Sequence, residues 1–297
     1  MKGIILAGGA GTRLYPLTLV TSKQLLPVYN KPMIYYPLST LMLAEIRDIL
    51  IISTPEDTTR MRNLLGDGSH FGIKLSYAIQ SSPDGLAQAF LIAEDFIGNE
   101  SSVMILGDNI FYGNGLGNRL KKAVGDADNG VATIFGYYVE EPKRFGIVEF
   151  EKKNRKENRV ISLEEKPQKP KSNYAIVGLY FYPKGVSEKA KLVRPSDRGE
   201  LEITSLNELY LQEDKLNVQL LGKGFSWMDA GTIDSLSEAS EFVRVVEKRQ
   251  GTIIGAPEEI AFRYHWIDQD TLLKSARKYG KSPYGKYLSQ VGEGKIL

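Results

Sequence analysis

The sequence predicts an α/β protein with a mostly parallel central sheet covered by helices on both faces. Short apolar runs alternate with helix-like stretches through the first half of the chain, an order typical of strands joined by crossover helices. The first run, residues 3–7, is apolar, as expected for a strand buried on both faces. A chain of 297 residues is long enough for one large α/β domain or a domain with an appendage.

The elements of the first half follow one another without an internal repeat or a low-complexity linker. Each strand is predicted from an apolar run, and each helix from the stretch between two such runs. We expect strands at residues 3–7, 49–53, 75–78 and 102–106, and helices near residues 37–44, 56–65 and 85–96.

The middle of the chain changes character toward short strands, which predict a small mixed β subdomain. A polar run at residues 152–158 is best interpreted as a solvated hairpin loop between two of these strands. The predicted strands are residues 144–151, 160–165 and 174–182, and helices are predicted at residues 203–213 and 235–249.

The last part of the chain is predicted to be a C-terminal helical appendage, residues 241–297, on a core of residues 1–240. After Gly251 the sequence contains Pro257, Trp266 and a tyrosine-glycine cluster around Tyr279 and Tyr284. Helices added to an α/β core commonly pack subunits together. We therefore expect the appendage to make subunit contacts.

The composition excludes several classes of site. A formal net charge of +2 does not favour a nucleic-acid partner. Cysteine is absent, which excludes disulfides, thiol catalysis and cysteine metal sites, and the two histidines, His70 and His265, are too few for a histidine-rich metal site. No apolar run approaches membrane-spanning length and no basic segment precedes one, so we expect a cytoplasmic protein. Phosphate, carboxylate and hard-metal chemistry remain.

The most informative feature is the glycine-rich turn after the first strand. Residues 8–14 read GGAGTRL, and Lys23 follows shortly after. Glycines let backbone N–H groups converge on an anion, and the N-terminus of a following helix would add positive potential. Arg13 and Lys23 would neutralise further charge. A plain connection from strand to helix would not explain three glycines together with both cations, so the turn predicts a polyphosphate site.

Two commoner nucleotide-binding loops do not fit this turn. A dinucleotide-binding loop needs G-x-G-x-x-G and an acidic residue about twenty positions later, but Leu14 stands at the third glycine and the acidic residue is absent. A Walker A loop needs Gly-Lys-Ser/Thr, whereas Gly11 is followed by Thr12 and Arg13. A nicotinamide oxidoreductase is therefore the weakest alternative.

Two aspartates stand where a divalent cation could bind together with a substrate phosphate. Asp108 follows the predicted strand at residues 102–106, and ligands of open α/β sheets collect at the carboxyl ends of strands. Asp229 is expected in a second turn, close to Gly231. Two carboxylates and phosphate oxygens form a normal Mg²⁺ environment. Taken alone, Asp229 fits equally well as a turn former or helix cap.

A third polar segment, Glu164 to Pro167, follows the predicted strand at residues 160–165. Pro167 cannot donate to a sheet, so the chain is expected to leave the sheet there. Lys166 could bind a phosphate and Glu165 a sugar hydroxyl. From the residues alone, a surface ion pair of little energetic value is the favoured interpretation.

Taken together, these segments resemble the signature of the sugar-1-phosphate nucleotidyltransferases, and the likeness covers nearly the whole chain. The matching segments, in the family's order, are residues 6–14, 23–27, 107–109, 164–167 and 227–232. Residues 80–89, 198–204 and 256–261 resemble in particular the subgroup that joins dTTP to α-D-glucose 1-phosphate, giving dTDP-glucose and pyrophosphate. The resemblance implies a Rossmann-like core with a nucleotide-binding half at about residues 1–110 and a sugar-binding half at about residues 111–240.

The resemblance also implies a role for each matching residue. The triphosphate would be held by Gly8, Gly11, Thr12 and Arg13 with help from Lys23, and the thymine and its nucleoside by Gln80 and Gly85, with Gln24 nearby. The glucose phosphate would contact Asn109, Gly146, Glu165, Lys166 and Ile176, and Mg²⁺ would bind Asp108 and Asp229. Arg13, Lys23 and Lys166 are the expected catalytic residues. For Glu165 and Lys166, the resemblance thus implies contacts to the substrate in place of the surface ion pair that the residues alone favour.

Members of the subgroup supply dTDP-sugars, chiefly dTDP-rhamnose, for surface polysaccharides. By resemblance we expect a homotetramer, with feedback by dTDP-rhamnose at a second nucleotide-sugar site between subunits. Lys223 stands where the resemblance predicts arginine.

Two alternatives of different kinds stay open from the sequence. One is a sibling enzyme that uses UTP, against which Gln24 argues, because an acidic residue is expected there in the uridylyl form. Thymine and uracil differ by one methyl group, worth about 1–3 kcal/mol in a pocket. The other is a nucleotide-sugar sensor that has kept the fold and lost the reaction, which would bind dTTP without releasing pyrophosphate.

Overall fold

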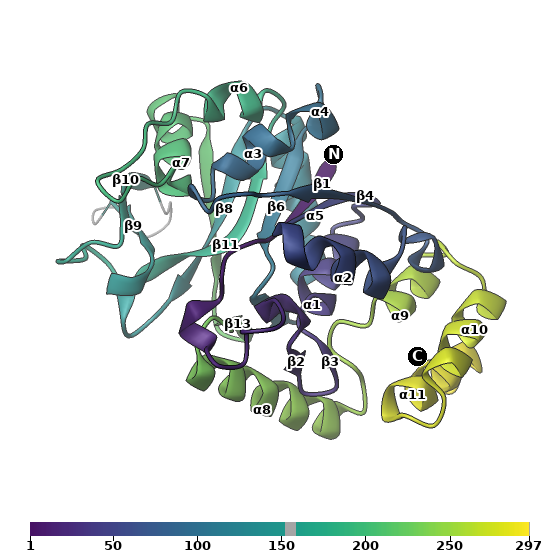
Figure 1. Cartoon of the computed structure of the whole chain (residues 1–297). Coiled ribbons are helices and arrows are strands. Elements are labelled where there is room, and N and C mark those ends of the chain that lie inside the picture. Colours follow the sequence, from purple (N-terminus) through teal and green to yellow (C-terminus); the bar gives the residue numbers. More distant parts are fainter. Residues whose placement is uncertain (152–158, 297) are drawn as a thin grey trace.

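A nine-stranded sheet runs through the part of the chain that the computed structural model describes, residues 1–151 and 159–296. At one side of the sheet four strands lie parallel, in the order β5, β4, β1, β6 (Figure 1). They are β1 (Lys2–Ala7), β4 (Asp48–Ser53), β5 (Lys74–Ile79) and β6 (Ser102–Leu106). These strands confirm the four that were predicted from apolar runs.

The long strand β11 (Tyr174–Tyr182) lies antiparallel to β6, and the sheet divides beyond it. One branch holds β9 (Gly146–Phe150) and β10 (Val160–Glu165), and the other holds β8 (Ala132–Tyr138) and β12 (Leu216–Leu221). Only β10 and β11 run against the other described strands of this sheet. The predicted mostly parallel sheet with a mixed β part is confirmed.

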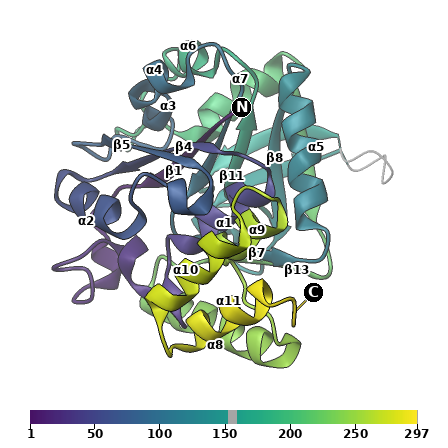
Figure 2. The same ribbon diagram turned by 90° about the vertical axis from the view of Figure 1, so that its right-hand side faces the viewer.

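Helices cover both faces of the sheet, because alternate side chains of each strand enter separate cores. On β1, Ile5 belongs to one core, and Ile4 and Leu6 belong to the other. The first core is covered by α1 (Tyr35–Leu43), α2 (Pro55–Leu65) and α5 (Leu116–Asp128), and the second by α3 (Gln88–Ile92), α4 (Glu94–Ile97), α6 (Val186–Ala190) and α7 (Ile203–Gln212). Figure 2 shows α5 and α1 on the side away from α3, α4 and α6.

A third core lies below the edge of the sheet, where α8 (Ile233–Gln250) packs on two small two-stranded sheets. These antiparallel sheets are β2 (Pro27–Val28) with β3 (Lys31–Pro32), and β7 (Asn109–Gly113) with β13 (Phe225–Asp229). The Thr232 side chain accepts from the Ser235 N–H and the Ser235 hydroxyl accepts from the Thr232 N–H, a capping box that fixes the start of α8. The start of α8 fixes in turn the direction in which the chain leaves β13.

The C-terminal segment is helical, as predicted, with α9 (Pro257–Arg263), α10 (Gln269–Tyr279) and α11 (Pro283–Gly292) side by side in Figure 2. Helix α8 passes without a break through residue 240, the expected end of the core. A buried polar cluster joins core and appendage. The Lys31 ammonium lies 3.2 Å from a Glu247 carboxylate oxygen, and Tyr279 and Tyr284 donate hydrogen bonds to Glu258.

Two predicted helices near the carboxyl ends of the parallel strands were wrong in detail. No α-helix follows the glycine-rich turn, which leads instead into the three-residue 3-10 helix η1 (Thr12–Leu14). Pro16 lacks an N–H and disfavours a helical residue before it, so this helix cannot continue. The helix expected near residues 85–96 is divided into α3 and α4 and begins later, because the Ala87 N–H donates to the Leu201 carbonyl at 3.0 Å rather than within a helix.

Several elements had no prediction, among them β7, α5, β8, β12 and β13. Glycines weaken the local signal in two of them: Gly117 and Gly125 lie within α5, and Gly136 lies within β8. The predicted strand at residues 144–151 begins only at Gly146, after the 3-10 helix η4 (Pro142–Arg144). The polar run at residues 152–158 lies outside the described residues.

Candidate active site

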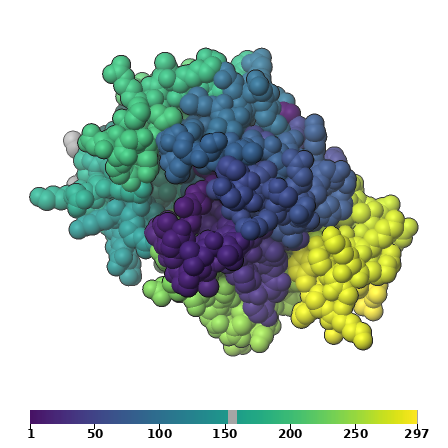
Figure 3. All heavy atoms as spheres, viewed as in Figure 1, coloured from purple at the N-terminus to yellow at the C-terminus, as the bar shows by residue number. Residues whose placement is uncertain are grey.

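A cleft of about 430 Å³ opens at the carboxyl ends of β1, β5 and β6 and extends across β11 toward β9 and β10. In Figure 3 the N-terminal segment, in purple, borders the hollowed part of the surface. The predicted site residues that line the cleft are Gly8, Arg13, Lys23, Gln80, Gly85, Asp108, Asn109, Gly146, Glu165, Lys166, Ile176 and Asp229. The fold thus brings residues from most of the core into one site.

The glycine-rich turn forms one wall of this cleft through Gly8, Gly9 and Arg13. Gly9 and Gly11 have positive φ angles of 94° and 61°, a conformation that glycine adopts without a steric cost. The Thr18 hydroxyl donates to the Gly11 carbonyl at 2.7 Å and thereby holds the turn from behind. Gly11 and Thr12 themselves do not line the cleft.

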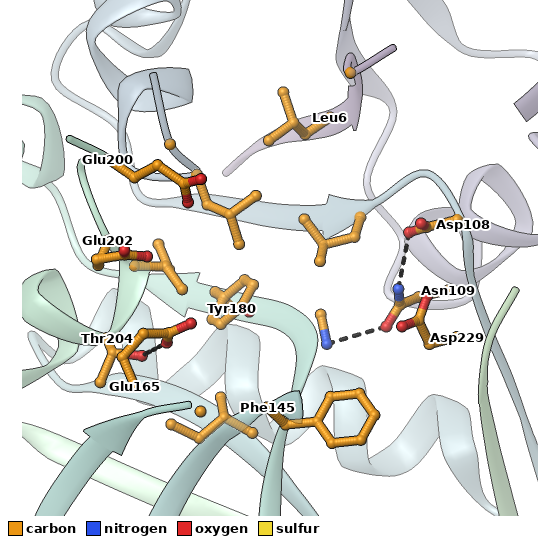
Figure 4. A pocket seen from close by; sticks show the side chains of 18 of the residues that line it. Leu6, Asp108, Asn109, Phe145, Glu165, Tyr180, Glu200, Glu202, Thr204 and Asp229 are labelled. Atoms are coloured by element: carbon orange, nitrogen blue, oxygen red, sulfur yellow. Dashed lines mark hydrogen bonds between the residues drawn. The ribbon is translucent and has the colours of Figure 1, made fainter. Parts of the chain in front are cut away.

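Asp108 and Asp229 meet because two strands remote in the sequence pair with each other. In the antiparallel β7–β13 pair, Asp229 stands opposite Asn109, and the Ala230 N–H donates to the Asp108 carbonyl at 3.0 Å. Both carboxylates also face Gly231, where an added Cβ would lie 2.9 Å from Asp229 Oδ1 and 3.5 Å from Asp108 Oδ2. Asp229 is therefore the last residue of a strand and not part of a turn, which corrects the expectation from the sequence. Figure 4 shows the pair on one side of the cleft.

The charges of the two carboxylates are balanced unequally. Burial alone would raise the pKa of Asp108, but the charge and hydrogen bond of Lys23, together with a hydrogen bond from Asn109, hold it below its ordinary value. Burial and the neighbouring Asp108 charge raise the pKa of Asp229, against the opposing charges of Lys23 and Arg13. Asp108 is therefore the more readily ionised carboxylate of the pair.

Asn109 is buried between the carboxylates and the far half of the cleft. Its Oδ1 accepts from the Trp227 indole N–H at 2.6 Å and from the Gly178 N–H at 3.1 Å, and its Nδ2 donates to Asp108 at 3.0 Å. Only 2% of the Asn109 surface is exposed, and both polar atoms of its side chain form hydrogen bonds within the protein. Its described contacts position Asp108 and Trp227.

The far half of the cleft is built around Glu165 and Lys166, at the end of β10. Figure 4 shows Glu165 beside Thr204, on the side of the cleft away from Asp108. Glu165 accepts hydrogen bonds from the Thr204 hydroxyl at 2.5 Å and from Arg198 at 3.4 Å. Lys166 lies 3.5 Å from the Glu165 carboxylate and has a φ of 42°, which is uncommon for a residue with a Cβ. A strained backbone of this kind is often kept where it aims a functional side chain.

Other residues line the cleft without having been assigned a role from the sequence. They are Leu6, Gly9, Pro83, Leu86, Leu106, Arg144, Phe145, Gly178, Tyr180, Glu200, Glu202, Ile203, Thr204 and Trp227. Glu200, Glu202, Thr204 and Trp227 lie inside segments that carried the resemblance, so that likeness was the signal available for them. Gln24 is 1% exposed and does not line the cleft, and its side-chain oxygen has no hydrogen-bond partner among the described residues.

The sequence pattern of the nucleotidyl transferase family matches residues 2–245, which includes the glycine-rich turn and both aspartates. The chain belongs to this family. It is accordingly an enzyme of the nucleotidyltransferase class. The match extends over the sheet and most of α8 but not over α9–α11.

Curated relatives match along nearly the full chain. A glucose-1-phosphate thymidylyltransferase of Neisseria meningitidis is 56% identical over 292 residues, 98% of this chain and 99% of that protein. A glucose-1-phosphate thymidylyltransferase of Mycobacterium tuberculosis is 54% identical over 293 residues, 99% of each chain. The likeness therefore includes the C-terminal helices that the family pattern leaves out.

Solved structures share the fold. A crystal structure from Bacillus anthracis, described as a glucose-1-phosphate thymidylyltransferase in complex with a sucrose, aligns with a TM-score of 0.74 and 41% identity over 82% of this chain and 95% of that chain. A UDP-glucose pyrophosphorylase complexed with UDP-glucose aligns with a TM-score of 0.73 over 84% of this chain and 99% of that chain, at 23% identity, and supports the fold alone.

Two features of the described residues concern membranes and metal ions. No helix in residues 1–151 and 159–296 is long and apolar enough to cross a membrane. Within the same residues, no three His, Asp or Glu side chains are grouped so that they could hold a metal ion by themselves. A cation beside Asp108 and Asp229 would therefore need further oxygen ligands from a substrate or from water.

Proposed function

We propose that this enzyme transfers a thymidylyl group from dTTP to α-D-glucose 1-phosphate, giving dTDP-glucose and pyrophosphate, the first step in making dTDP-rhamnose and related sugars for surface polysaccharides. The observation that carries the proposal is one cleft that holds the glycine-rich turn with Arg13 and Lys23 at one end and the Glu165 carboxylate, with its hydrogen bond from Thr204, at the other. The full-length relatives with the matching activity in their names support the choice of substrates.

In this reaction a phosphate oxygen of glucose 1-phosphate attacks the α-phosphorus of dTTP in line. A new P–O bond forms while the bond from the α-phosphorus to the bridging oxygen breaks, and pyrophosphate leaves with that electron pair. The attacking phosphate is already ionised, so the step needs no strong general base. Catalysis then consists of positioning and charge neutralisation.

The chain's own cations supply that neutralisation. Arg13 and Lys23 would bind the triphosphate, since both line the cleft beside the glycine-rich turn. Lys166 would hold the phosphate of the sugar, from which the attacking oxygen comes, because it stands in the far half of the cleft. The Glu165 carboxylate, held by Thr204 and Arg198, would accept hydrogen bonds from sugar hydroxyls.

Mg²⁺ is the cofactor that the donor set fits. Asp108 and Asp229 offer hard oxygen ligands close together, which are the ligands that Mg²⁺ prefers. Phosphate oxygens of the substrate would complete the coordination. When bound, the ion would polarise the triphosphate and draw charge from the leaving pyrophosphate.

The test is pyrophosphate release from glucose 1-phosphate and Mg²⁺ with dTTP, UTP, ATP, CTP or GTP in turn. We expect rapid release with dTTP, weaker release with UTP and negligible release with purines. A preference for another nucleotide would assign the enzyme to a sibling activity, and silence with every nucleotide from a folded protein that still binds dTTP would indicate a sensor.

We also propose a homotetramer inhibited by dTDP-rhamnose, on the strength of the sequence resemblance. Light scattering of the purified protein tests the oligomeric state, and inhibition of pyrophosphate release by added dTDP-rhamnose tests the feedback. The cytoplasmic location expected from the sequence stays a prediction.

A further inference from the structure

A chain of three side chains connects the nucleotide end of the cleft to a neighbouring loop. Gln80 Nε2 donates to Gln88 Oε1 at 2.6 Å, and Gln88 Nε2 donates to Asp84 Oδ2 at 2.7 Å. Gln80 is 7% exposed and lines the cleft, whereas Gln88 stands behind it on α3. The far end of the chain is Asp84, which also accepts from the Ser82 hydroxyl at 2.6 Å.

The direction of this chain is set by the carboxylate at its end. An ionised carboxylate only accepts hydrogen bonds, whereas an amide can donate from one side and accept on the other. Asp84 therefore compels Gln88 to turn its NH₂ group toward the loop and its oxygen toward Gln80. Gln80 must then turn its own NH₂ group toward Gln88. The hydrogen bonds of Gln88 and Asp84 therefore determine which way the Gln80 amide faces.

As a result, Gln80 presents its oxygen to the cleft. Oε1 lies over Gly8, so close that any side chain at residue 8 would collide with it. The Gln80 backbone is fixed as well, since its N–H donates to the Ser53 carbonyl at 2.8 Å. The cleft wall next to the glycine-rich turn thus carries a hydrogen-bond acceptor whose direction is predetermined.

The loop that carries Asp84 is also fixed in place. The Leu201 N–H donates to the Asp84 carbonyl at 2.7 Å. Gly85, with a φ of 113°, lies so close to the Leu201 backbone that no Cβ would fit there. Asp84 is therefore held at a set position although its side chain is at the surface.

We propose that Asp84 and Gln88 are positioning residues that lock the Gln80 amide with its oxygen toward the nucleotide base, so that the enzyme selects bases with a ring N–H and rejects cytosine. This inference rests on the proposed function. Thymine and uracil carry a donor at N3, between two carbonyl groups, whereas cytosine carries an acceptor there. The Gln80 oxygen, as a fixed acceptor, can bind the N3–H of thymine or uracil but faces another acceptor at N3 of cytosine. It does not distinguish thymine from uracil, because it makes no contact that depends on the methyl group.

The experiment measures kcat/KM for dTTP, dUTP and dCTP in four proteins: wild type, Gln88→Met, Asp84→Asn, and Asp84→Asn combined with Gln88→Glu. Asp84→Asn is nearly isosteric. Because Asn can donate as well as accept, it no longer fixes the orientation of the Gln88 amide. Gln88→Met breaks the chain. In the double variant the carboxylate at position 88 can only accept from Gln80, so the orientation is restored.

We expect the preference for dTTP over dCTP to fall about tenfold in Asp84→Asn and in Gln88→Met, the value of roughly one oriented hydrogen bond. It should return in the double variant, while the ratio of dTTP to dUTP stays constant in all four proteins. Equal losses with all three nucleotides, or a double variant that does not recover, would overturn the proposal. A wild-type enzyme without turnover of dTTP would instead contradict the proposed function.

Discussion

The Lys23 ammonium donates a hydrogen bond to Oδ2 of Asp108, across 85 positions of sequence. Lys23, which is proposed to bind the triphosphate, is thus held against Asp108, which is proposed to bind the metal ion. Both side chains are largely buried, with 15% and 8% of their surfaces exposed. Asp108 thus stays ionised beside Asp229, and the cleft is charged and ordered before substrates enter.

Asp108→Asn is expected to lower turnover by more than tenfold without unfolding the protein, as is Arg13→Ala. Asp108→Asn removes a negative charge proposed to hold the metal ion, and Arg13→Ala removes a positive charge proposed to neutralise the triphosphate, where electrostatic stabilisation commonly contributes most. Pyrophosphate release and a urea melt of each variant provide the measurement. Asp270→Asn, at an exposed position on α10, is the matched control. Near-normal turnover in either cleft variant would contradict the assigned role.

Lys166→Gly should separate activity from stability. Glycine adopts the φ of 42° at this position without strain, so the urea midpoint should stay constant or rise slightly. Loss of the ammonium should raise the KM for glucose 1-phosphate about 10- to 100-fold, as expected for one charge-assisted hydrogen bond, with the KM for dTTP little changed. An unchanged KM for the sugar phosphate would remove Lys166 from the substrate contacts.

Asn109→Ala and Trp227→Phe should not act independently on stability. The indole N–H of Trp227 has Asn109 Oδ1 as its partner at 2.6 Å, so each substitution leaves the other group without that bond, at a cost of about 1–3 kcal/mol. A double-mutant cycle from urea denaturation should give a coupling energy of at least about 0.5 kcal/mol. Additive effects would mean that the bond contributes nothing to folding.

Lys31→Met is expected to destabilise the protein by about 3–5 kcal/mol, because it leaves the buried Glu247 carboxylate without its cation. Adding Glu247→Gln should recover most of this loss, since the amide keeps an oxygen that can accept from the Ile254 N–H. The two free energies of unfolding, from urea melts at pH 7, test the pair. A double variant as unstable as Lys31→Met would show that the charge is not the cause.

The same pair predicts a pH dependence. Burial lowers the pKa of Lys31 from 10.5 to about 8, against the opposing charges of Glu247 and Glu258. The folded state therefore releases this proton at a lower pH than the unfolded chain. Between about pH 8 and pH 10.5 the unfolded chain binds more protons, so the contribution of Lys31 to the free energy of unfolding rises with pH.

The measurement is the stability of the wild type minus that of Lys31→Met with Glu247→Gln, from pH 7 to 10.5. This difference should be constant below pH 8 and rise above it. The ring of Tyr36 lies 4.5 Å from the Lys31 ammonium, and burial raises the pKa of that tyrosine well above its ordinary value, so it stays neutral over this range. A flat difference across the whole range would contradict the lowered pKa.

Local patterns predicted the nucleotide half of the fold well. The apolar runs that became β1, β4, β5 and β6 are continuous in the sequence, and the glycines after β1 mark the turn by their conformational freedom. Asp108 could be placed at a strand end from its neighbours alone. The helix predicted after the turn does not form, because Pro16 ends any helix there.

The sequence by itself therefore determined the α/β class, the parallel strands and the position of the glycine-rich turn after β1, since these depend on neighbours along the chain. Only the tertiary structure decided that Asp229 stands beside Asp108, that Asp84 orients Gln80 through Gln88, and that Lys31 is buried against Glu247. Each of these contacts joins groups whose approach depends on strand pairing, helix packing or loop closure. These contacts depend on the packing of the whole fold. Packing of this kind produces no periodic pattern in the sequence from which the contacts could be predicted.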